Sequence, residues 1–517
     1  MVANNIFNRP MSRAQFLRTC GLAAGSLVLS GLGSLGEPRP AFASGTVIKN
    51  EELCTVGSDH AVVTWVTPGE NTDTSIYIGS DQNNLTKLTM EQNKEYHWAE
   101  VKNLRPDTRY WYQVESNGAK GPKSSFKTLP NPGGRYLFSY ALFSDTHISN
   151  GVSEGDPNEI YFGKLTEDSK DLLIQCIRDA RNRGIDMAVV TGDLTDSSSQ
   201  FQYEQLRDEI LPNFGNTPYY LCIGNHDKYE KRSKGGGLGV RGFFENIGRR
   251  ENPYASVMFQ DHQFLLIDSC IKDDDWGTID PGQMEWIRQT LQKGGDRPAY
   301  LFFHHTCNGL DVWFGINNFL SFQNVINDFP GVQAVFNGHM HRNVVTTNWL
   351  MTRNRPYVEL PATVQFPCGY GIVRVYERGF EYNSYKVSRL DLAEKSRSKV
   401  ILGLVGGAIY TWYAYNGIGD RSITYSDGNL HRPVHYELAV TLDDRRAMEL
   451  YEKAQAFDGA TLTPAEEAGK TRVILGRYES QEVAQEEQRA KSASYGIQAL
   501  VTADGNRDVP DSVKQHR

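Results

Sequence analysis

One stretch, MAVVTGDLTD at residues 187–196, joins an apolar run to a turn of metal-ligand residue types. Its apolar half is typical of a short buried strand, and Gly192 permits the tight turn that places Asp193 directly after that strand. Four further apolar runs are followed by the same kinds of residue; these runs are 136–143, 218–223, 300–303 and 333–336. The repeated order of strand and polar turn predicts an α/β fold.

The polar turns form a series. They read SDTH at 144–147, GDLTD at 192–196, GNHD at 224–227, HH at 304–305 and GHMH at 338–341. Because the carboxyl ends of strands in an α/β sheet face a common crevice, we expect the five clusters to converge. Carboxylate, imidazole and amide-oxygen ligands suit iron, manganese or zinc, rather than a metal that selects soft thiolate ligands. One cluster alone has many structural explanations, but five in order predict a metal centre.

Short apolar strands alternate with amphipathic helices from Arg135 to about Leu392, which predicts a layered α/β domain at residues 134–395. One predicted helix buries Leu172, Leu173, Cys176, Ile177 and Ala180. Another begins at Asp280-Pro281 and turns Met284, Ile287 and Leu291 inward.

The clusters resemble the calcineurin-like metallophosphoesterase family, whose pattern is D-x-H, G-D-x-x-D, G-N-H-D/E, H and G-H-x-H. The resemblance covers about residues 135–390 and implies a four-layer α-β-β-α sandwich with two divalent or trivalent metal ions (Fe, Mn or Zn). It implies that Asp193 bridges both ions. The other ligands are Asp145, His147 and His341 for one ion, and Asn225, His304 and His339 for the other. His304 is preferred over His305 because the family ligand follows its strand directly.

This resemblance implies an enzyme that hydrolyses phosphomono- or phosphodiester bonds, with a metal-bridging hydroxide as nucleophile. It also implies that His226 protonates the leaving oxygen or stabilises the transition state. Asp196 would pair with His226, because a carboxylate behind a histidine raises its pKa and fixes its tautomer. The alternative is that His226 only orients the Asn225 loop. We expect the substrate to be a small phosphoester, with diesters favoured over monoesters.

Two departures narrow the resemblance. Purple acid phosphatases carry D-x-G and G-D-x-x-Y, whereas this chain has His147 and Asp196 at those positions, so no tyrosinate–iron colour is expected. Protein serine/threonine phosphatases place an arginine directly after G-D-x-x-D, whereas Ser197 follows here. The motifs look most like the class III cyclic-nucleotide phosphodiesterase branch, whose members hydrolyse varied mono- and diesters.

Residues 1–43 have the features of a bacterial signal peptide. Arg9, Arg13 and Arg18 precede a glycine-rich apolar run, and Ala41-Phe42-Ala43 forms a cleavage site. The sequence SRAQFLR at 12–18 resembles the twin-arginine export motif except at Ala14, so the twin-arginine and general secretory routes both stay open. We therefore expect a periplasmic or secreted protein.

Residues 44–130 are expected to form a small all-β sandwich. Ala61, Val63 and Trp65 alternate along one strand. The run LRPDTRY at 104–110 resembles the corner of a fibronectin type III domain, a kind of domain that precedes the catalytic unit in several secreted phosphoesterases. Such a domain is either a rigid spacer or a wall of the active-site mouth.

The carboxyl-terminal third divides into a connector at 396–434, an α+β domain at 435–506 and a disordered tail at 507–517. Val400 to Gly419 is uncharged, but its glycines disfavour a transmembrane helix and favour a strand pair or a cover on the catalytic domain. Residues 435–504 contain a weak duplication of strand and capped helix. This resembles the β-α-β-β-α-β SPOR domain, which binds peptidoglycan; a packing or oligomerisation role is the alternative.

Composition excludes some functions. The net charge of −8, which becomes −11 without residues 1–43, argues against general nucleic-acid binding. Six scattered cysteines follow the signal segment, and no spacing reveals a disulfide pattern; Cys176 and Cys222 are expected to be buried thiols. A non-enzymatic peptidoglycan-binding protein with a vestigial phosphoesterase domain is the alternative function, but that interpretation calls for missing ligands and none is missing.

Overall fold

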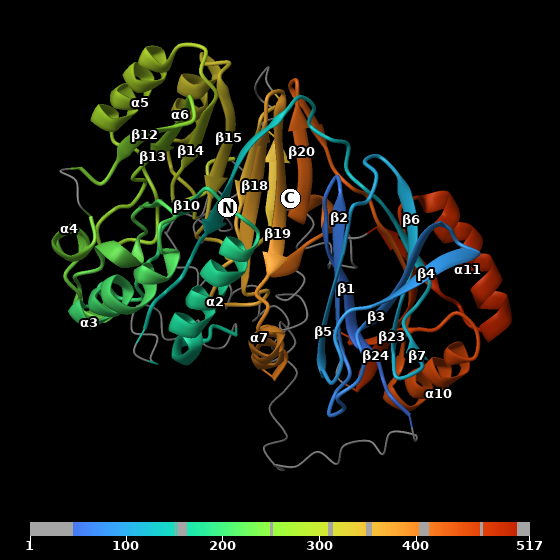
Figure 1. The fold of residues 1–517 in the computed structure, drawn as a ribbon. Helices are drawn as coiled ribbons and strands as arrows, with labels where there is room; N and C mark the ends of the chain where they lie inside the picture. Colours follow the sequence, from blue (N-terminus) through green and yellow to red (C-terminus); the bar gives the residue numbers. More distant parts are fainter. Residues whose placement is uncertain are drawn as a thin grey trace, which may run out of the picture.

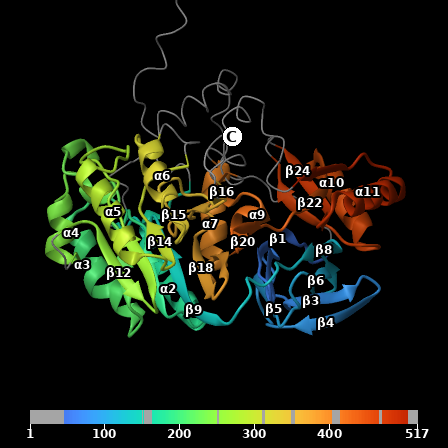
Figure 2. The same cartoon turned by 90° about the horizontal axis from the view of Figure 1, so that it is seen from above.

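The computed structural model describes residues 45–149, 151, 163–248, 252–308, 314–347, 354–402, 413–465 and 469–503. The predicted signal peptide and the predicted tail lie outside these residues. An α/β domain occupies the left of both views, and the N-terminal β-sandwich and the C-terminal unit lie together on the right (Figure 1; Figure 2).

Two sheets form the α/β domain. The first sheet has the order β11 (Tyr219–Leu221), β10 (Met187–Val190), β9 (Tyr136–Phe143), β18 (Gly369–Tyr376), β19 (Gly379–Lys386), β20 (Ser422–Ser426) and β21 (Asn429–His431). The second has the order β12 (Ala255–Phe259), β13 (His262–Leu266), β14 (Ala299–Phe302), β15 (Val332–Asn337), β17 (Pro356–Glu359) and β16 (Val344–Thr347). Strands β9, β10 and β11 are parallel, and so are β13, β14 and β15.

An aromatic core separates the two sheets. Tyr140 of β9 lies with its ring centroid 5.4 Å from that of Phe264 and 6.0 Å from that of Phe302, both on the second sheet. Because side chains alternate along a strand, Phe143 of the same strand points to the opposite face and packs there with the helical layer. Burial on both faces explains why these strands are continuous apolar runs in the sequence.

Helices cover the outer faces and complete the predicted four layers (Figure 1). The first sheet is covered by α2 (Ser169–Asn182), α3 (Gln200–Gln205) with its continuations η3 (Leu206–Ile210) and η4 (Leu211–Phe214), and α4 (Val240–Asn246). The second sheet is covered by α5 (Pro281–Gly294) and α6 (Phe319–Asn327). Asp280 caps α5 by accepting a hydrogen bond from Gln283 N at 3.0 Å, so this helix begins where the sequence predicts. The α-β-β-α architecture is confirmed.

The N-terminal region is an all-β sandwich, as predicted. One sheet contains β1 (Lys49–Val56), β2 (His60–Val66) and β5 (Tyr96–Lys102). The other contains β4 (Asn84–Thr89), β3 (Ser75–Asp81), β6 (Arg109–Ser116), β7 (Ala119–Lys120) and β8 (Ser124–Lys127). The hydroxyl of Tyr110 accepts a hydrogen bond from Arg105 N at 2.9 Å, which is the tyrosine corner of such sandwiches.

The C-terminal unit has the element order that the duplication predicts. It contains β22 (Tyr436–Asp443), α10 (Asp444–Gln455), β23 (Thr461–Pro464), β24 (Lys470–Tyr478), α11 (Gln481–Tyr495) and β25 (Leu500–Ala503). The side chains of Asp443 and Ser480 cap the two helices. The resemblance to SPOR domains and the binding of peptidoglycan stay predictions.

This unit is joined to the N-terminal sandwich, which the sequence does not predict. Strand β23 lies beside β1, so the sheet order runs β25-β22-β24-β23-β1-β2-β5. The Tyr451 hydroxyl accepts a hydrogen bond from Ile48 N at 2.9 Å, and Arg477 N donates to Ser124 Oγ at 3.1 Å. Chain segments about 400 residues apart therefore form one continuous sheet.

The predicted connector, residues 396–434, contacts the catalytic domain in the parts that the structure describes. Strand β20 pairs with β19, and Asn343 N donates to Ala414 O at 2.9 Å. The helices α7 (Leu390–Leu402) and α9 (Ile418–Arg421) flank residues 403–412, which lie outside the described residues. Among the described residues, no helix is both long and apolar enough to span a membrane.

The six cysteines that follow residue 43 are buried free thiols in the structure. Cys176 packs in the core between α2 and the first sheet, and Cys222 packs between the two sheets. The prediction for these two thiols is confirmed.

Candidate metal centre

The seven predicted ligands follow strands of the two sheets at one edge. Asp145 and His147 follow β9, Asp193 follows β10, and Asn225 lies beyond β11. From the second sheet, His304 follows β14, and His339 and His341 follow β15. All seven side chains are buried, none being more than 5% exposed. The parallel strands therefore deliver their polar ends to one place, as the strand order predicts.

The backbone at these ligands is strained. Positive φ angles of 51, 40, 49, 70 and 51° occur at Asp145, His147, Asp193, His339 and His341 respectively. Non-glycine residues in this conformation cost roughly 1–3 kcal/mol each, and such strain concentrates at functional sites. The backbone conformation that directs these five side chains therefore lowers the stability of the fold.

Two glycines are required by close approach of the chain. A Cβ atom at Gly224 would lie 2.0 Å from Asp193 N, and one at Gly338 would lie 1.9 Å from Ser144 Oγ. Gly192 instead has a φ of 107°, which favours glycine. The predicted role of all three glycines in bringing the ligand loops together agrees with this geometry.

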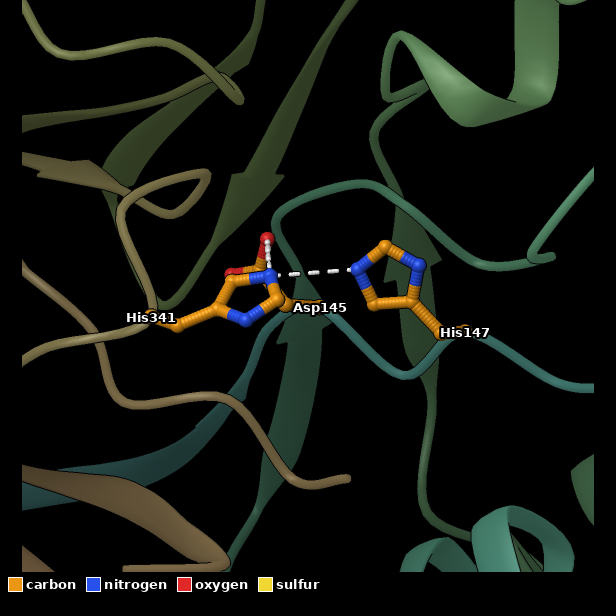
Figure 3. Close-up of side chains that lie close together, drawn as sticks. All are labelled: Asp145, His147 and His341. Atoms are coloured by element: carbon orange, nitrogen blue, oxygen red, sulfur yellow. Dashed lines mark hydrogen bonds and ion pairs between the residues drawn. The ribbon is translucent and has the colours of Figure 1, made fainter. Parts of the chain in front are cut away.

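Asp145, His147 and His341 form one group. His341 Nε2 lies 3.2 Å from Asp145 Oδ1 and 3.1 Å from His147 Nε2. Figure 3 shows a ring nitrogen of His147 and one of His341 pointing toward each other, with the Asp145 carboxylate beside the His341 ring. Two imidazole nitrogens this close repel each other unless a proton or a cation lies between them, so the donor set fits a metal ion.

Asp193, His304 and His339 form a second group. His304 Nε2 lies 3.1 Å from Asp193 Oδ2 and 3.2 Å from His339 Nδ1. The same Asp193 oxygen lies 3.5 Å from His147 Nε2, so Asp193 stands between the two groups. The structure thus brings together the residues of both predicted sites around one shared carboxylate.

The Asn225 amide, the last of the seven predicted ligands, has a defined orientation. Its Nδ2 donates to the Tyr229 hydroxyl at 2.8 Å. Its Oδ1 is buried and has no hydrogen-bond partner among the described residues. A buried amide oxygen without a donor fits a metal ligand, because an unsatisfied buried acceptor is otherwise costly.

Comparisons with known proteins agree with this geometry. The calcineurin-like phosphoesterase family model matches residues 138–343, which include all seven predicted ligands. This domain is a calcineurin-like metallophosphoesterase. The model of the purple acid phosphatase N-terminal domain matches residues 52–128. The family assignment makes the catalytic domain that of a metal-dependent phosphoesterase.

Three similar proteins illustrate the match. The chain is 28% identical over 223 residues to a probable glycerophosphodiester phosphodiesterase GpdQ of Arcobacter nitrofigilis, covering 40% of this chain and 72% of that protein. It is 26% identical over 233 residues to the 3',5'-cyclic adenosine monophosphate phosphodiesterase CpdA of Escherichia coli K12, covering 43% and 75%. The structure of purple acid phosphatase PPD1 from yellow lupin aligns with a TM-score of 0.35 and 18% identity, covering 66% and 73%.

Hydrogen bonds behind the metallophosphoesterase ligands orient them. Ser144 Oγ donates to Asp145 Oδ2 at 2.6 Å. The Nδ1 of His341 lies 2.5 Å from Gln365 Oε1, and that of His304 lies 3.1 Å from Thr191 O. Because both acceptors are oxygens, Nδ1 carries the hydrogen and Nε2 is left to bind a metal. The motifs do not reveal Gln365, since it lies 24 residues from its partner in a loop without a ligand pattern.

Local charges set the protonation of the ligands. Burial, reinforced by the Lys164 ammonium, lowers the pKa of His147 to about 4, which keeps its imidazole neutral. Burial would also lower the pKa of His304, but the Asp193 carboxylate outweighs it and raises that pKa to about 9. Burial would raise the pKa of Asp145, but His341 outweighs it and lowers the pKa to about 2. The carboxylates are therefore ionised near neutral pH.

Asp196 and His226 lie beside the first group, where an Asp196 carboxylate oxygen and ring nitrogens of His226 and His147 lie within 4.8 Å of one another. His226 Nδ1 lies 2.6 Å from the main-chain oxygen of Asp196, to which it donates. The Asp196 carboxylate also contacts Lys164 Nζ at 2.5 Å and His147 Nδ1 at 3.5 Å. The orienting bond of His226 thus comes from the main chain. Lys164 is fully buried and lies in no motif, so its residue type and spacing do not reveal it.

His305 lies beside the centre, with its ring centroid 4.5 Å from that of His339. Its Nδ1 lies 2.9 Å from Ser269 Oγ, and a Cβ at Gly277 would lie 2.6 Å from its ring. Burial holds the pKa of His305 well below its ordinary value. These contacts hold the His305 ring in place, and its Nε2 is buried without a hydrogen-bond partner among the described residues.

Another cluster of possible ligands, Asp59, His60 and Glu381, lies where the sandwich meets the catalytic domain. The Arg374 guanidinium contacts both Asp59 carboxylate oxygens, at 2.8 and 3.1 Å. His60 Nε2 lies 2.6 Å from the Tyr385 hydroxyl. The Arg374 guanidinium thus supplies a positive charge in this cluster. The cluster joins the two domains.

Proposed function

We propose that this chain is an exported phosphoesterase that hydrolyses phosphodiester bonds in small molecules, and phosphomonoesters less readily, at a dinuclear metal centre. The observation that carries the proposal is the meeting of two buried histidine–carboxylate groups at one shared carboxylate, Asp193. The remaining ligands would be Asp145, His147 and His341 for one ion, and Asn225, His304 and His339 for the other.

The donor set selects borderline transition metals, so Fe, Mn or Zn would occupy the two positions. When bound, the two ions lower the pKa of water and offset the charge that develops on the phosphoryl oxygens. The side chains hold this chemistry in a buried setting where electrostatic interactions are stronger than in water. Asp193 would reduce the repulsion between the two ions.

His226 is the proposed proton donor. Its Nδ1 hydrogen is committed to Asp196 O at 2.6 Å, and its Nε2 lies 3.9 Å from Asp193 Oδ2. In the imidazolium form, Nε2 carries a hydrogen beside the centre and can donate it to the leaving oxygen. Asp196 contributes by holding this orientation through its main chain and by placing a negative charge nearby.

The substrate proposal rests on the relatives. Two of them are named for glycerophosphodiester and cyclic-nucleotide phosphodiesterase activity, and both are diester hydrolases by name. A small phosphodiester is therefore the first substrate class to test, with monoesters as the comparison.

The test compares bis(4-nitrophenyl) phosphate with 4-nitrophenyl phosphate in protein reconstituted with Mn²⁺, Fe²⁺ or Zn²⁺. We expect metal-dependent hydrolysis that is faster for the diester. Asp193→Asn and His339→Ala should abolish hydrolysis and lose bound metal together. His262→Asn is the control, because His262 lies at the far end of β13 and bonds to Gln260 O. Full activity in the Asp193→Asn protein would contradict the proposal.

Export is tested separately. We expect processing after Ala43, with the mature protein in the periplasm or medium. Replacing Arg13 and Arg18 with lysine should block export if the twin-arginine route is used and should leave it unchanged if the general secretory route is used. A full-length protein that stays in the cytoplasm with an intact N-terminus would remove the exported part of the proposal.

A further inference from the structure

The orientation of the Asn225 amide matters more than that of the other predicted ligands. An asparagine side chain ends in one acceptor oxygen and one NH2 group, and only the oxygen can bind a cation. A half-turn of the amide would point two hydrogens at the metal position. Some feature of the fold must therefore select one of the two orientations.

Tyr229 provides that selection. Its hydroxyl lies 2.8 Å from Asn225 Nδ2 and 2.5 Å from Asp275 Oδ1. A carboxylate can only accept, so the hydroxyl hydrogen is committed to Asp275 and the oxygen lone pair faces Asn225. Of the two ends of the Asn225 amide, only the NH2 group can donate to that oxygen; the other donor to it, Lys234 Nζ, lies farther away at 3.4 Å. The hydrogen bonds thus run in one direction, from amide to hydroxyl to carboxylate.

Lys234 holds the far end of this chain. Its Nζ lies 2.6 Å from Asp275 Oδ1 and 4.7 Å from the centre of the Tyr229 ring. The ammonium places a positive charge beside the Asp275 carboxylate, which accepts the hydroxyl hydrogen of Tyr229. Since Lys234 and Asp275 are about one-fifth exposed, the unit links the buried amide to the edge of the protein.

The surrounding contacts fix Tyr229 in place. Its side chain is 1% exposed, and its ring centroid lies 4.6 Å from that of His226. Its main-chain oxygen accepts from Ser198 Oγ at 2.8 Å. The next two residues donate main-chain hydrogen bonds to Asp273, both at 2.7 Å, which ties the Tyr229 loop to the Asp275 loop.

We propose that Tyr229, supported by Asp275 and Lys234, is a positioning residue that turns the Asn225 amide oxygen toward the second metal position. This inference rests on the proposed function, because it assumes that Asn225 is a ligand. Loss of the Tyr229 hydroxyl frees the amide to rotate, and partners behind a ligand typically change metal affinity 10- to 100-fold. The effect should fall on the second ion, because Tyr229 contacts none of the first group in the described contacts.

The experiment titrates metal-free full-length protein with Mn²⁺, using calorimetry for affinity and electron paramagnetic resonance to separate single from exchange-coupled ions. Wild-type protein should bind two ions and give a coupled signal. Tyr229→Phe should bind the second ion about 10- to 100-fold more weakly and give mainly a single-ion signal at the same concentration. Tyr203→Phe is the matched control, because this buried hydroxyl bonds to Asp227 O at 3.2 Å rather than to Asn225.

A second pair of variants separates positioning from general support of the loop. Asn225→Asp offers oxygens in both orientations, so the hydroxyl is no longer needed to choose between them. In that background, Tyr229→Phe should change second-ion affinity less than about threefold, a non-additive result. An equal loss in both backgrounds would mean that Tyr229 supports the loop, and the inference would be wrong.

The remaining outcomes are also decisive. If Tyr229→Phe does not fold, Asp275→Ala is tested in its place. It should weaken binding of the second ion at least threefold and leave the affinity for the first ion unchanged. Wild-type affinity for both ions in the variant used overturns the inference alone. Wild-type protein that binds fewer than two ions overturns the proposed function, and the inference with it.

Discussion

Replacing Lys164 with methionine should destabilise the protein more than any surface change of the same kind. Lys164 Nζ lies 2.5 Å from Asp196 Oδ1, and both side chains are fully buried. Burial alone would raise the pKa of Asp196, but Lys164 holds it well below its ordinary value. Methionine fills similar volume without the charge, so the Asp196 carboxylate would be left buried without its ammonium.

Breaking one side of a buried ion pair typically costs about 3–5 kcal/mol. The surface control is Lys170→Met, whose partner Glu209 lies 2.9 Å away with the two side chains 37% and 51% exposed. Exposed pairs of this kind contribute at most about 1 kcal/mol. The expected difference between the two variants is therefore about 2–5 kcal/mol in the free energy of unfolding.

The assay is urea-induced unfolding of the metal-free protein, followed by tryptophan fluorescence at pH 7. A double variant, Lys164→Met with Asp196→Leu, should recover part of the loss because no buried charge remains. The deficit of Lys164→Met should also shrink as pH falls from 7 to 4, since the unpaired Asp196 carboxyl takes up a proton. If Lys164→Met is as stable as Lys170→Met, then Lys164 and Asp196 do not form a buried ion pair that stabilises the fold, which would contradict the prediction.

Two further predictions concern pH. Burial raises the pKa of Glu51 to about 8, so the folded state holds a proton that the unfolded state releases above its ordinary pKa, and stability falls as pH rises toward 8. Glu51→Gln should therefore gain stability over wild type by about 1.4 kcal/mol per pH unit between pH 5 and 7. Glu52→Gln should instead lose stability at pH 7, because Glu52 pairs with Arg397. Urea unfolding at several pH values checks both variants, and the same pH dependence of stability in wild type and Glu51→Gln would contradict the first prediction. The Asp193 carboxylate raises the pKa of His304 to about 9 against the effect of burial, so metal binding at pH 7 should release a proton and tighten as pH rises to 9. Calorimetry in buffers of different ionisation enthalpy measures that proton, and a pH-independent affinity would count against it.

Local features of the sequence predict much of the fold and the arrangement of the centre. The strands before Asp145 and Asp193 are short apolar runs because both of their faces are buried. Ligand residues directly after such strands lie at the same edge of the sheet, so their convergence follows from sheet topology. Helix starts such as Asp280 are also local, since the capping side chain and its partner are three residues apart.

Other features depend on contacts between distant segments. Lys164 and Gln365 reach the ligands from loops whose sequences carry no motif, so nothing local marks them. His226 Nδ1 donates to the main-chain oxygen of Asp196, and a main-chain acceptor leaves no trace in residue type. The joining of β23 to β1 has the same cause, because residue pairing across about 400 positions is not encoded in either strand alone.

Anomalous diffraction from crystals soaked in Mn²⁺ tests the two-metal centre most directly. We expect two peaks, one among Asp145, His147 and His341 and one among Asn225, His304 and His339, with the Asp193 carboxylate between them. Two cations sharing such a carboxylate lie about 3.5–4 Å apart. A single peak, or peaks away from these side chains, would contradict this expectation.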